Sequence, residues 1–295
     1  MTDTFVEEEI ATQPEMWRRA AALLPEVSGD LPHSGERIAV VGCGTSWFMA
    51  QSYAAAREAA GHGETDAFPG SEFPHGRRYD RIVAISRSGT TTEVIDLFRS
   101  ASGVPTLLIT GVPNSPATQE ADATIALPFA DERSVVQTRF ATTTLALLRA
   151  HLGDDIDTLA QQAERALAVD VSEMLDAEQV TFLGRGPAVG LAAEAALKMR
   201  EAARFWAESY PAMDYRHGPL AIAQTGRLVW SLGDLPPGLA DDIAATGAEL
   251  VRHAELDPLP ALIVAQRFAV AQAKQRGLDP DRPRSLARSV ILDEV

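Results

Sequence analysis

The most constraining feature of the sequence is a hydroxyl-rich hexapeptide, Ser86-Arg87-Ser88-Gly89-Thr90-Thr91, between an apolar run and a helical pattern. Residues 81–85 indicate a buried strand, and residues 93–98 open a helix. Side-chain hydroxyls, free backbone N–H groups and the positive end of a helix dipole therefore meet at one point, which suits a phosphate group. A Ser/Thr-rich cap on an ordinary strand-to-helix turn would give the same pattern, because such caps are common.

A second copy of this device lies earlier in the chain. Residues 37–41 indicate a strand, which leads into Gly42-Cys43-Gly44-Thr45-Ser46 and then a helix over 47–60. Two such units in one domain place both loops at one edge of a parallel sheet, where open α/β folds bind ligands. The spacing lacks the third glycine of the dinucleotide fingerprint, and no P-loop lysine follows. We interpret the two loops as a site for a monophosphate.

The alternation of strands and helices predicts an α/β fold with parallel sheets. The strands before residue 150 are expected at 37–41, 64–68, 81–85, 104–110 and 123–127, and a helix over 138–152 closes that domain. The pattern then restarts, with strands at 180–183, 227–232 and 248–253 and helices at 188–207 and 259–276. Both halves open with a strand, a glycine turn and a helix, which suggests a duplicated domain.

The expected organisation has four parts. They are an N-terminal helical arm and linker (1–35), a first domain with the phosphate site (36–152), a linker helix (153–175), and a shortened second domain that includes the C-terminal tail (176–295).

The composition of the chain limits the classes of molecule that it can be expected to bind. A net charge of -15 over 295 residues argues against nucleic acid or an anionic membrane surface. The single cysteine, Cys43, excludes an intrachain disulfide and a cysteine-rich metal site, and we expect no metal and no cofactor. The N-terminal residues lack a secretory h-region, and no apolar run is long enough to cross a membrane, so we expect a cytoplasmic protein.

The second half carries an acid–base pattern. Glu194, Lys198 and Glu201 share one face of the predicted helix 188–207. Such a stripe is usually a solvated ladder of ion pairs, but this helix is otherwise rich in Ala, Leu and Met, and buried charges need a reason. His217 lies in a His-Gly-Pro turn; a lone loop histidine is more often a surface residue, although imidazole is easily tuned near neutral pH. A glutamate and a histidine near a phosphosugar suit proton movement between neighbouring carbons.

These residues resemble the sugar isomerase (SIS) domain family, and most closely the isomerase half of glucosamine-6-phosphate synthase with its relatives, the aminosugar-phosphate deaminases and fructosamine-6-phosphate deglycases. The resemblance covers nearly the whole chain in order. The matching segments are residues 9–14, 42–46, 86–91, the region of Thr138, 182–186, 194–201, 207–210, 217–221 and 281–290.

The resemblance implies two tandem SIS domains, each a parallel sheet flanked by helices in three layers. It implies that Glu201 is the general base at the sugar C1–C2, and that His217 serves ring opening or protonates the departing amine. In the family this histidine reaches the neighbouring protomer's site, so a homodimer is implied. The resemblance also implies that Thr45, Ser46, Ser86, Ser88 and Thr91 hold the phosphate. We expect the remaining substrate-binding residues to be Gly44, Arg87, Glu194, Lys198 and Arg288.

Three departures from the synthase matter. No glutaminase domain with its cysteine nucleophile is present in this sequence, so we expect no glutamine hydrolysis. The synthase's tail lysine, which forms a Schiff base, is Arg288 here, and arginine cannot form one. The serine-glutamine-serine loop is Ser86-Arg87-Ser88, and Gln137 replaces a serine. Arg87 would clamp the phosphate or would face solvent.

Two functions follow as expectations. The first is an enzyme of the sugar-phosphate isomerase, aminosugar-phosphate deaminase or deglycase type, acting by Glu/His acid–base catalysis on a ketosamine or aminosugar 6-phosphate. The alternative is a non-catalytic phosphosugar sensor, as SIS domains serve in regulators. Lys198 has two roles open to it, either an ion pair with its helix neighbours or a contact that holds Glu201 ionised or binds a sugar hydroxyl.

Overall fold

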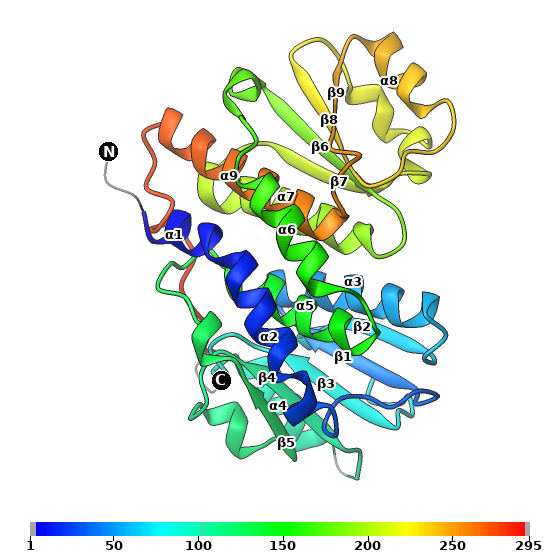
Figure 1. Ribbon diagram of the computed structural model, residues 1–295, viewed down its shortest axis with the longest axis vertical. Helices are drawn as coiled ribbons and strands as arrows, with labels where there is room; N and C mark the ends of the chain where they lie inside the picture. The colour runs from blue at the N-terminus through cyan, green and yellow to red at the C-terminus, as the bar shows by residue number, and fades with distance from the viewer. Residues whose placement is uncertain (1–3, 102, 293–295) are drawn as a thin grey trace. The chain divides into compact units, whose positions relative to one another are not determined.

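The computed structural model describes residues 4–101 and 103–292, which divide into two compact units. The five-stranded unit comprises residues 15–156 and 287–292. The four-stranded unit comprises residues 4–14 and 157–286. Each unit is built on its own parallel sheet (Figure 1).

The sheet of the five-stranded unit has the order β2-β1-β3-β4-β5, and all its strand pairs are parallel. Val41 of β1 lies opposite Ala84 of β3, so these two strands end side by side. Strands β1, β3 and β4 are buried almost throughout, as expected of a parallel sheet that is covered on both faces. The strands are β1 (Ile38–Gly42), β2 (Thr65–Pro69), β3 (Arg81–Ile85), β4 (Thr106–Thr110) and β5 (Ala123–Ala126).

Helices complete the layers of this unit. Val94, Leu97 and Phe98 of α4 pack on one set of alternating strand residues, which includes Ala39 and Ala84. Helices α3 and α5 pack against each other, and α3 also packs on β1. The helices are α2 (Gln13–Val27), α3 (Thr45–Ala59), α4 (Thr92–Ser100) and α5 (Arg139–His151).

The four-stranded unit repeats the plan with the sheet order β7-β6-β8-β9, again all parallel. Leu239 and Ile243 of α8 pack with Leu183 and Val229 of the sheet, while α7 and α9 pack on each other and on the strands. The elements are α1 (Phe5–Ala11), α6 (Ile156–Ala166), β6 (Gln179–Gly184), α7 (Ala188–Ala203), β7 (Ala207–Pro211), β8 (Arg227–Leu232), α8 (Leu239–Thr246), β9 (Glu249–Arg252) and α9 (Pro258–Gln275).

The predicted fold class is confirmed, because two parallel sheets of five and four strands are flanked by helices. Several elements differ from the sequence-based expectation. Residues 207–211 form the edge strand β7, because Arg204 adopts a left-handed conformation (φ 49°) that ends α7 early. Helix α2 continues through Pro25, which lies in its last turn. Helix α8 is short and was not expected.

The C-terminal residues 287–292 belong to the five-stranded unit, although the sequence analysis grouped the tail with the second domain. Their hydrogen bonds, described below, account for that position. In the part of the chain that the structure describes, no helix is both long and apolar enough to cross a membrane.

The turn after β1 depends on a glycine. A Cβ on Gly42 would lie 2.6 Å from the Ser46 carbonyl carbon and 2.7 Å from the Trp47 nitrogen, so helix α3 would have to move. We predict that Gly42→Ala lowers the free energy of unfolding by ~2 kcal/mol, as overpacking does, measured by urea denaturation. Gly29→Ala is the matched control, because nothing lies within 4 Å of its Cβ position. Equal stability of the two variants would contradict the close approach of α3 to β1.

Candidate functional site

The hexapeptide loop connects the end of β3 to the start of α4. The Ser86 N–H continues the ladder by donating to the Ile109 carbonyl at 3.0 Å, and the Gly89 N–H then donates to Ser86 Oγ at 3.2 Å. Gly89 has a φ of +61°, and a Cβ there would lie 1.9 Å from Ser115 Oγ. The loop therefore turns tightly and admits only glycine at this position.

The hydroxyls of both loops are mostly buried. Thr45, Ser46 and Ser86 are each 4% exposed and Ser88 is 8% exposed, while Thr91 is half-buried. Ser86 Oγ and Thr91 Oγ1 lie 3.4 Å apart. Since β1 and β3 are adjacent and parallel, both loops lie at the same edge of the sheet. Helices α3 and α4 begin there, so their positive ends also face that edge.

Arg87 is buried in this loop, with 5% exposure, so the solvent-facing alternative is wrong. Its Nη1 donates to the carbonyls of Ser134 and Val135, and its Nη2 donates to those of Val135 and Arg288. Its Nη1 also lies 3.6 Å from Oε2 of the fully buried Glu132. A phosphate contact by Nη1 or Nη2 would compete with these backbone bonds, whereas the buried Nε has no hydrogen-bond partner among the described residues.

Glu132 is a residue that the sequence analysis missed. Its Oε1 accepts hydrogen bonds from Thr138 N at 2.6 Å, Thr138 Oγ1 at 3.0 Å and Arg139 N at 2.7 Å, at the start of α5. In the sequence, Asp131-Glu132-Arg133 looks like an ordinary charged loop. The one sequence pattern that could have indicated its role is an acidic residue six positions before Thr138, at the start of a predicted helix.

The C-terminal tail crosses the same loop. Arg288 donates from its guanidinium to the Glu132 carbonyl and to Asp131 Oδ1, the latter at 2.5 Å. Thr90 Oγ1 donates to Ser289 Oγ at 2.7 Å, and the Leu292 N–H donates to Thr92 Oγ1 at 3.0 Å. The tail is thus tied to the hexapeptide loop and to residues 131–132 through both its backbone and its side chains.

The predicted acid–base stripe is a buried charge cluster on α7 of the four-stranded unit. Lys198 Nζ lies 2.5 Å from Glu201 Oε2 and 3.3 Å from Glu194 Oε1, and the side chains of Lys198 and Glu194 are each 1% exposed. Both ion pairs that the sequence analysis considered for Lys198 are present. The Glu201 side chain is 15% exposed, and its Oε1 accepts no hydrogen bond from the described residues.

Lys198 remains charged in this cluster. Burial acts to lower the pKa of its ammonium group, but the carboxylates of Glu194 and Glu201 outweigh burial and raise that pKa above its ordinary value. A protonated amine cannot attack a carbonyl group. The cluster therefore presents Lys198 as a fixed cation beside Glu201 and not as an imine-forming nucleophile.

His217 lies in an exposed turn of the same unit. The backbone N–H of His217 donates to the Asp214 carbonyl at 2.9 Å, and Gly218 follows with a φ of +127°. Two exposed apolar side chains lie nearby in the sequence, Trp206 at 50% and Met213 at 56% exposure. Among the described residues, no group of three or more His, Cys, Asp or Glu side chains forms a candidate metal site.

Residues 32–152 match the model of the SIS domain family. The chain is a SIS domain protein. It is similar along 99% of its length, with 30% identity, to a glutamine--fructose-6-phosphate aminotransferase (isomerizing) of Methanothermobacter thermautotrophicus, and it spans 58% of that relative's length.

Solved structures share the fold of this SIS domain protein. A glucosamine-6-phosphate deaminase from Thermotoga maritima superposes with a TM-score of 0.81 and 22% identity, covering 98% of this chain and 100% of that one. A tagatose-6-phosphate ketose/aldose isomerase from Escherichia coli gives a TM-score of 0.78 and 21% identity, covering 94% and 95%.

The buried Arg87–Glu132 pair yields a stability prediction. Arg87→Gln leaves the Glu132 carboxylate buried without its cation, so we expect the free energy of unfolding to fall by ~3 kcal/mol. The double variant Arg87→Gln/Glu132→Gln should lose less than the sum of the single variants, because no unpaired charge remains. Arg99→Gln is the control, because the Arg99 side chain is 59% exposed. Strict additivity in the cycle would contradict the coupling.

The raised pKa of Lys198 yields a chemical prediction. At neutral pH its ammonium form cannot condense with a ketose, so borohydride reduction in the presence of fructose 6-phosphate should leave the protein mass unchanged. The other lysine, Lys274, lies 2.5 Å from Glu7 and is also ion-paired. An adduct that forms in the unmodified protein and disappears in Lys198→Arg would contradict the assignment.

Proposed function

We propose that this protein is an enzyme that acts on a ketosamine or aminosugar 6-phosphate, by deglycation or deamination, with aldose–ketose isomerisation as the closely related reaction. The observation that carries the proposal is the buried cluster on α7, in which Lys198 binds one oxygen of Glu201 and leaves the other available. A carboxylate held in this way can take up and return a proton without rearranging.

The phosphate would bind at the two hydroxyl loops of the five-stranded unit. Buried hydroxyls and the N-terminal ends of two helices at one edge of the sheet favour a dianion. The residues proposed to hold it are Gly44, Thr45, Ser46, Ser86, Ser88 and Thr91.

The proton transfers follow from the open-chain sugar. For a 2-amino aldose, Glu201 removes the proton from C2, and the electron pair passes to the carbonyl oxygen and gives an enaminol. Return of the proton to C1 produces a ketimine, and water then hydrolyses it to a ketose and ammonia. His217 would open the ring first and later protonate the departing nitrogen. The same C1–C2 transfer without an amine is an aldose–ketose isomerisation.

The proposal differs from the synthase reaction, in which a tail lysine forms an imine. The guanidinium of Arg288 donates to Glu132 and Asp131, and Arg87 donates to its carbonyl. Arg288 thereby holds the C-terminal tail against residues 131–132 and Arg87. We infer that any contact of Arg288 with substrate is electrostatic.

A homodimer would complete the site. His217 is exposed in its turn, and Trp206 and Met213 provide apolar surface in the same stretch of chain. Large exposed aromatic side chains and methionines are enriched at protein interfaces. We propose that this turn docks on a second copy and brings His217 to the neighbouring active site.

Replacing the proposed catalytic groups tests the function. Glu201→Gln and His217→Ala should each lower turnover of glucosamine 6-phosphate or fructosamine 6-phosphate at least ~100-fold, because general acid–base catalysis contributes that much. Release of ammonia or amine is the readout, and Glu173→Gln, at an exposed position, is the control. Tight binding of these sugars without any turnover in the unmodified protein would favour the sensor function instead.

Mixing the two inactive variants tests the dimer. If His217 acts in the partner's site, a mixed dimer of Glu201→Gln and His217→Ala chains contains one site with both groups intact. Equal mixing with subunit exchange should restore about a quarter of the activity, because half of the dimers are mixed and each has one good site. Activity that stays at the level of the single variants would place both groups in one chain's site.

A further inference from the structure

The four-stranded unit contains a second crevice at the topological position of the phosphate loops. In both sheets the first strand of the unit lies between its next two strands: β1 lies between β2 and β3, and β6 lies between β7 and β8. The strand order therefore reverses at β6, since one connection leads to a strand on one side of β6 and the next leads to a strand on its other side. Open parallel sheets bind ligands at such a switch point, outside the carboxyl ends of the strands.

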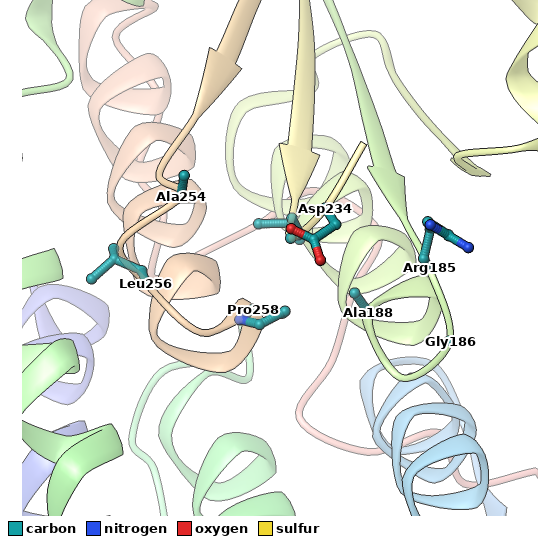
Figure 2. Close-up of a pocket in the computed structure, with 9 residues that line it drawn as sticks. Arg185, Gly186, Ala188, Asp234, Ala254, Leu256 and Pro258 are labelled. Carbon is teal, nitrogen blue, oxygen red and sulfur yellow. The ribbon is translucent and has the colours of Figure 1, made fainter. Parts of the chain in front are cut away.

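A pocket of about 440 Å³ occupies this crevice (Figure 2). Its walls come from the segments that follow three neighbouring strands, and its size is within the range of sites for small ligands. The lining residues are Arg185, Gly186 and Ala188 after β6, Leu232, Gly233 and Asp234 at the end of β8, and Ala254, Leu256 and Pro258 after β9.

Two charged side chains of opposite sign belong to this pocket. Figure 2 shows the Asp234 carboxylate pointing into the space between Ala188 and Pro258, and Arg185 at the edge with its guanidinium directed away from Asp234. Within the described residues, neither side chain forms a hydrogen bond or an ion pair. The carboxylate of Asp234 and the guanidinium of Arg185 are thus available to a ligand.

Hydrogen bonds order the pocket wall at Gly233 and the segments that adjoin the pocket. Ser231 Oγ donates to the Gly233 carbonyl at 3.0 Å, and Arg216 Nη2 donates to the Pro237 carbonyl at 2.9 Å. Asp257 Oδ1 caps α9 by accepting from Leu259 N at 2.9 Å. A preformed pocket binds with a smaller entropic cost, because its loops are already ordered.

The chemistry of this pocket differs from that of the first site. Gly184-Arg185-Gly186-Pro187-Ala188 stands where the first unit has Gly42-Cys43-Gly44-Thr45-Ser46, so the hydroxyls are absent. The first N–H groups of α7 offer little to an anion, because those of Ala188 and Val189 already donate to the carbonyls of Arg185 and Gly186. An anionic group would pair with Arg185, and an ammonium group would pair with Asp234.

We propose that this pocket is a second ligand site that binds an aminosugar phosphate, with its ammonium group at Asp234 and its phosphate at Arg185. The choice of ligand rests on the proposed function, because the aminosugar-phosphate substrate of that reaction carries both groups. The site is distinct from the hydroxyl loops and binds without turnover.

The test is the number of molecules bound per chain, measured by isothermal titration calorimetry with glucosamine 6-phosphate. The full chain carrying Glu201→Gln is used throughout to suppress turnover. Two molecules per chain are expected, and adding Asp234→Asn should weaken one of them at least ~10-fold, because a charge-assisted contact is lost. Asp241→Asn, at an exposed position of α8, should change neither. Glucose 6-phosphate, which lacks the amine, should bind only once.

The outcomes separate this inference from the proposed function. One molecule per chain, unaffected by Asp234→Asn, would overturn the second site and leave the first. Binding of both molecules that survives Ser86→Ala/Ser88→Ala would contradict the phosphate loops and leave the second site. Loss of a different molecule by each set of substitutions would support both assignments.

Discussion

The parallel pairing of β1 with β3 is the constraint on which the position of the two hydroxyl loops depends. Because Val41 and Ala84 lie opposite each other, the two strands end together and the loops that follow them share one edge. Tight approach of the helices at Gly42 and the left-handed turn at Gly89 then bury the hydroxyls instead of leaving them in solvent. Backbone geometry thus determines where these hydroxyl groups lie.

Buried charge is organised in both units by pairing. In the five-stranded unit, Arg87 and Glu132 hold the hexapeptide loop, the start of α5 and the tail in one network. In the four-stranded unit, Lys198 lies between two carboxylates. Desolvation makes each of these groups costly alone, and each is tolerated because its partner is within a few ångströms. The first network ties the hexapeptide loop to neighbouring segments, and the second is the one that we propose for proton transfer.

The buried strands and the charge cluster on α7 could be predicted from the sequence, for physical reasons. Apolar runs such as residues 81–85 and 227–232 are buried strands because parallel sheets are covered on both faces, and the spacing of Glu194, Lys198 and Glu201 places them together on any helix. The edge strand β7 was missed, because its half-exposed residues carry no apolar run and its start depends on the conformation of Arg204.

The hydrogen-bond partners of Arg87 also could not be predicted from the sequence. They come from residues 132–135 and 288, distant in the chain, and most of them are backbone carbonyls, which leave no mark in the sequence. The placement of residues 287–292 with the first sheet depends on the same contacts. Long-range hydrogen bonds to backbone carbonyls are therefore the part of the candidate site that the sequence does not predict and that the three-dimensional structure shows.

We propose that the two hydroxyl loops hold one phosphate together, and a crystal structure of the Glu201→Gln protein soaked with a hexose 6-phosphate can test this. We expect the phosphate oxygens to lie within hydrogen-bond distance of the hydroxyls of Ser46, Ser86 and Ser88. A fully occupied sugar phosphate bound elsewhere, with both loops empty, would contradict it.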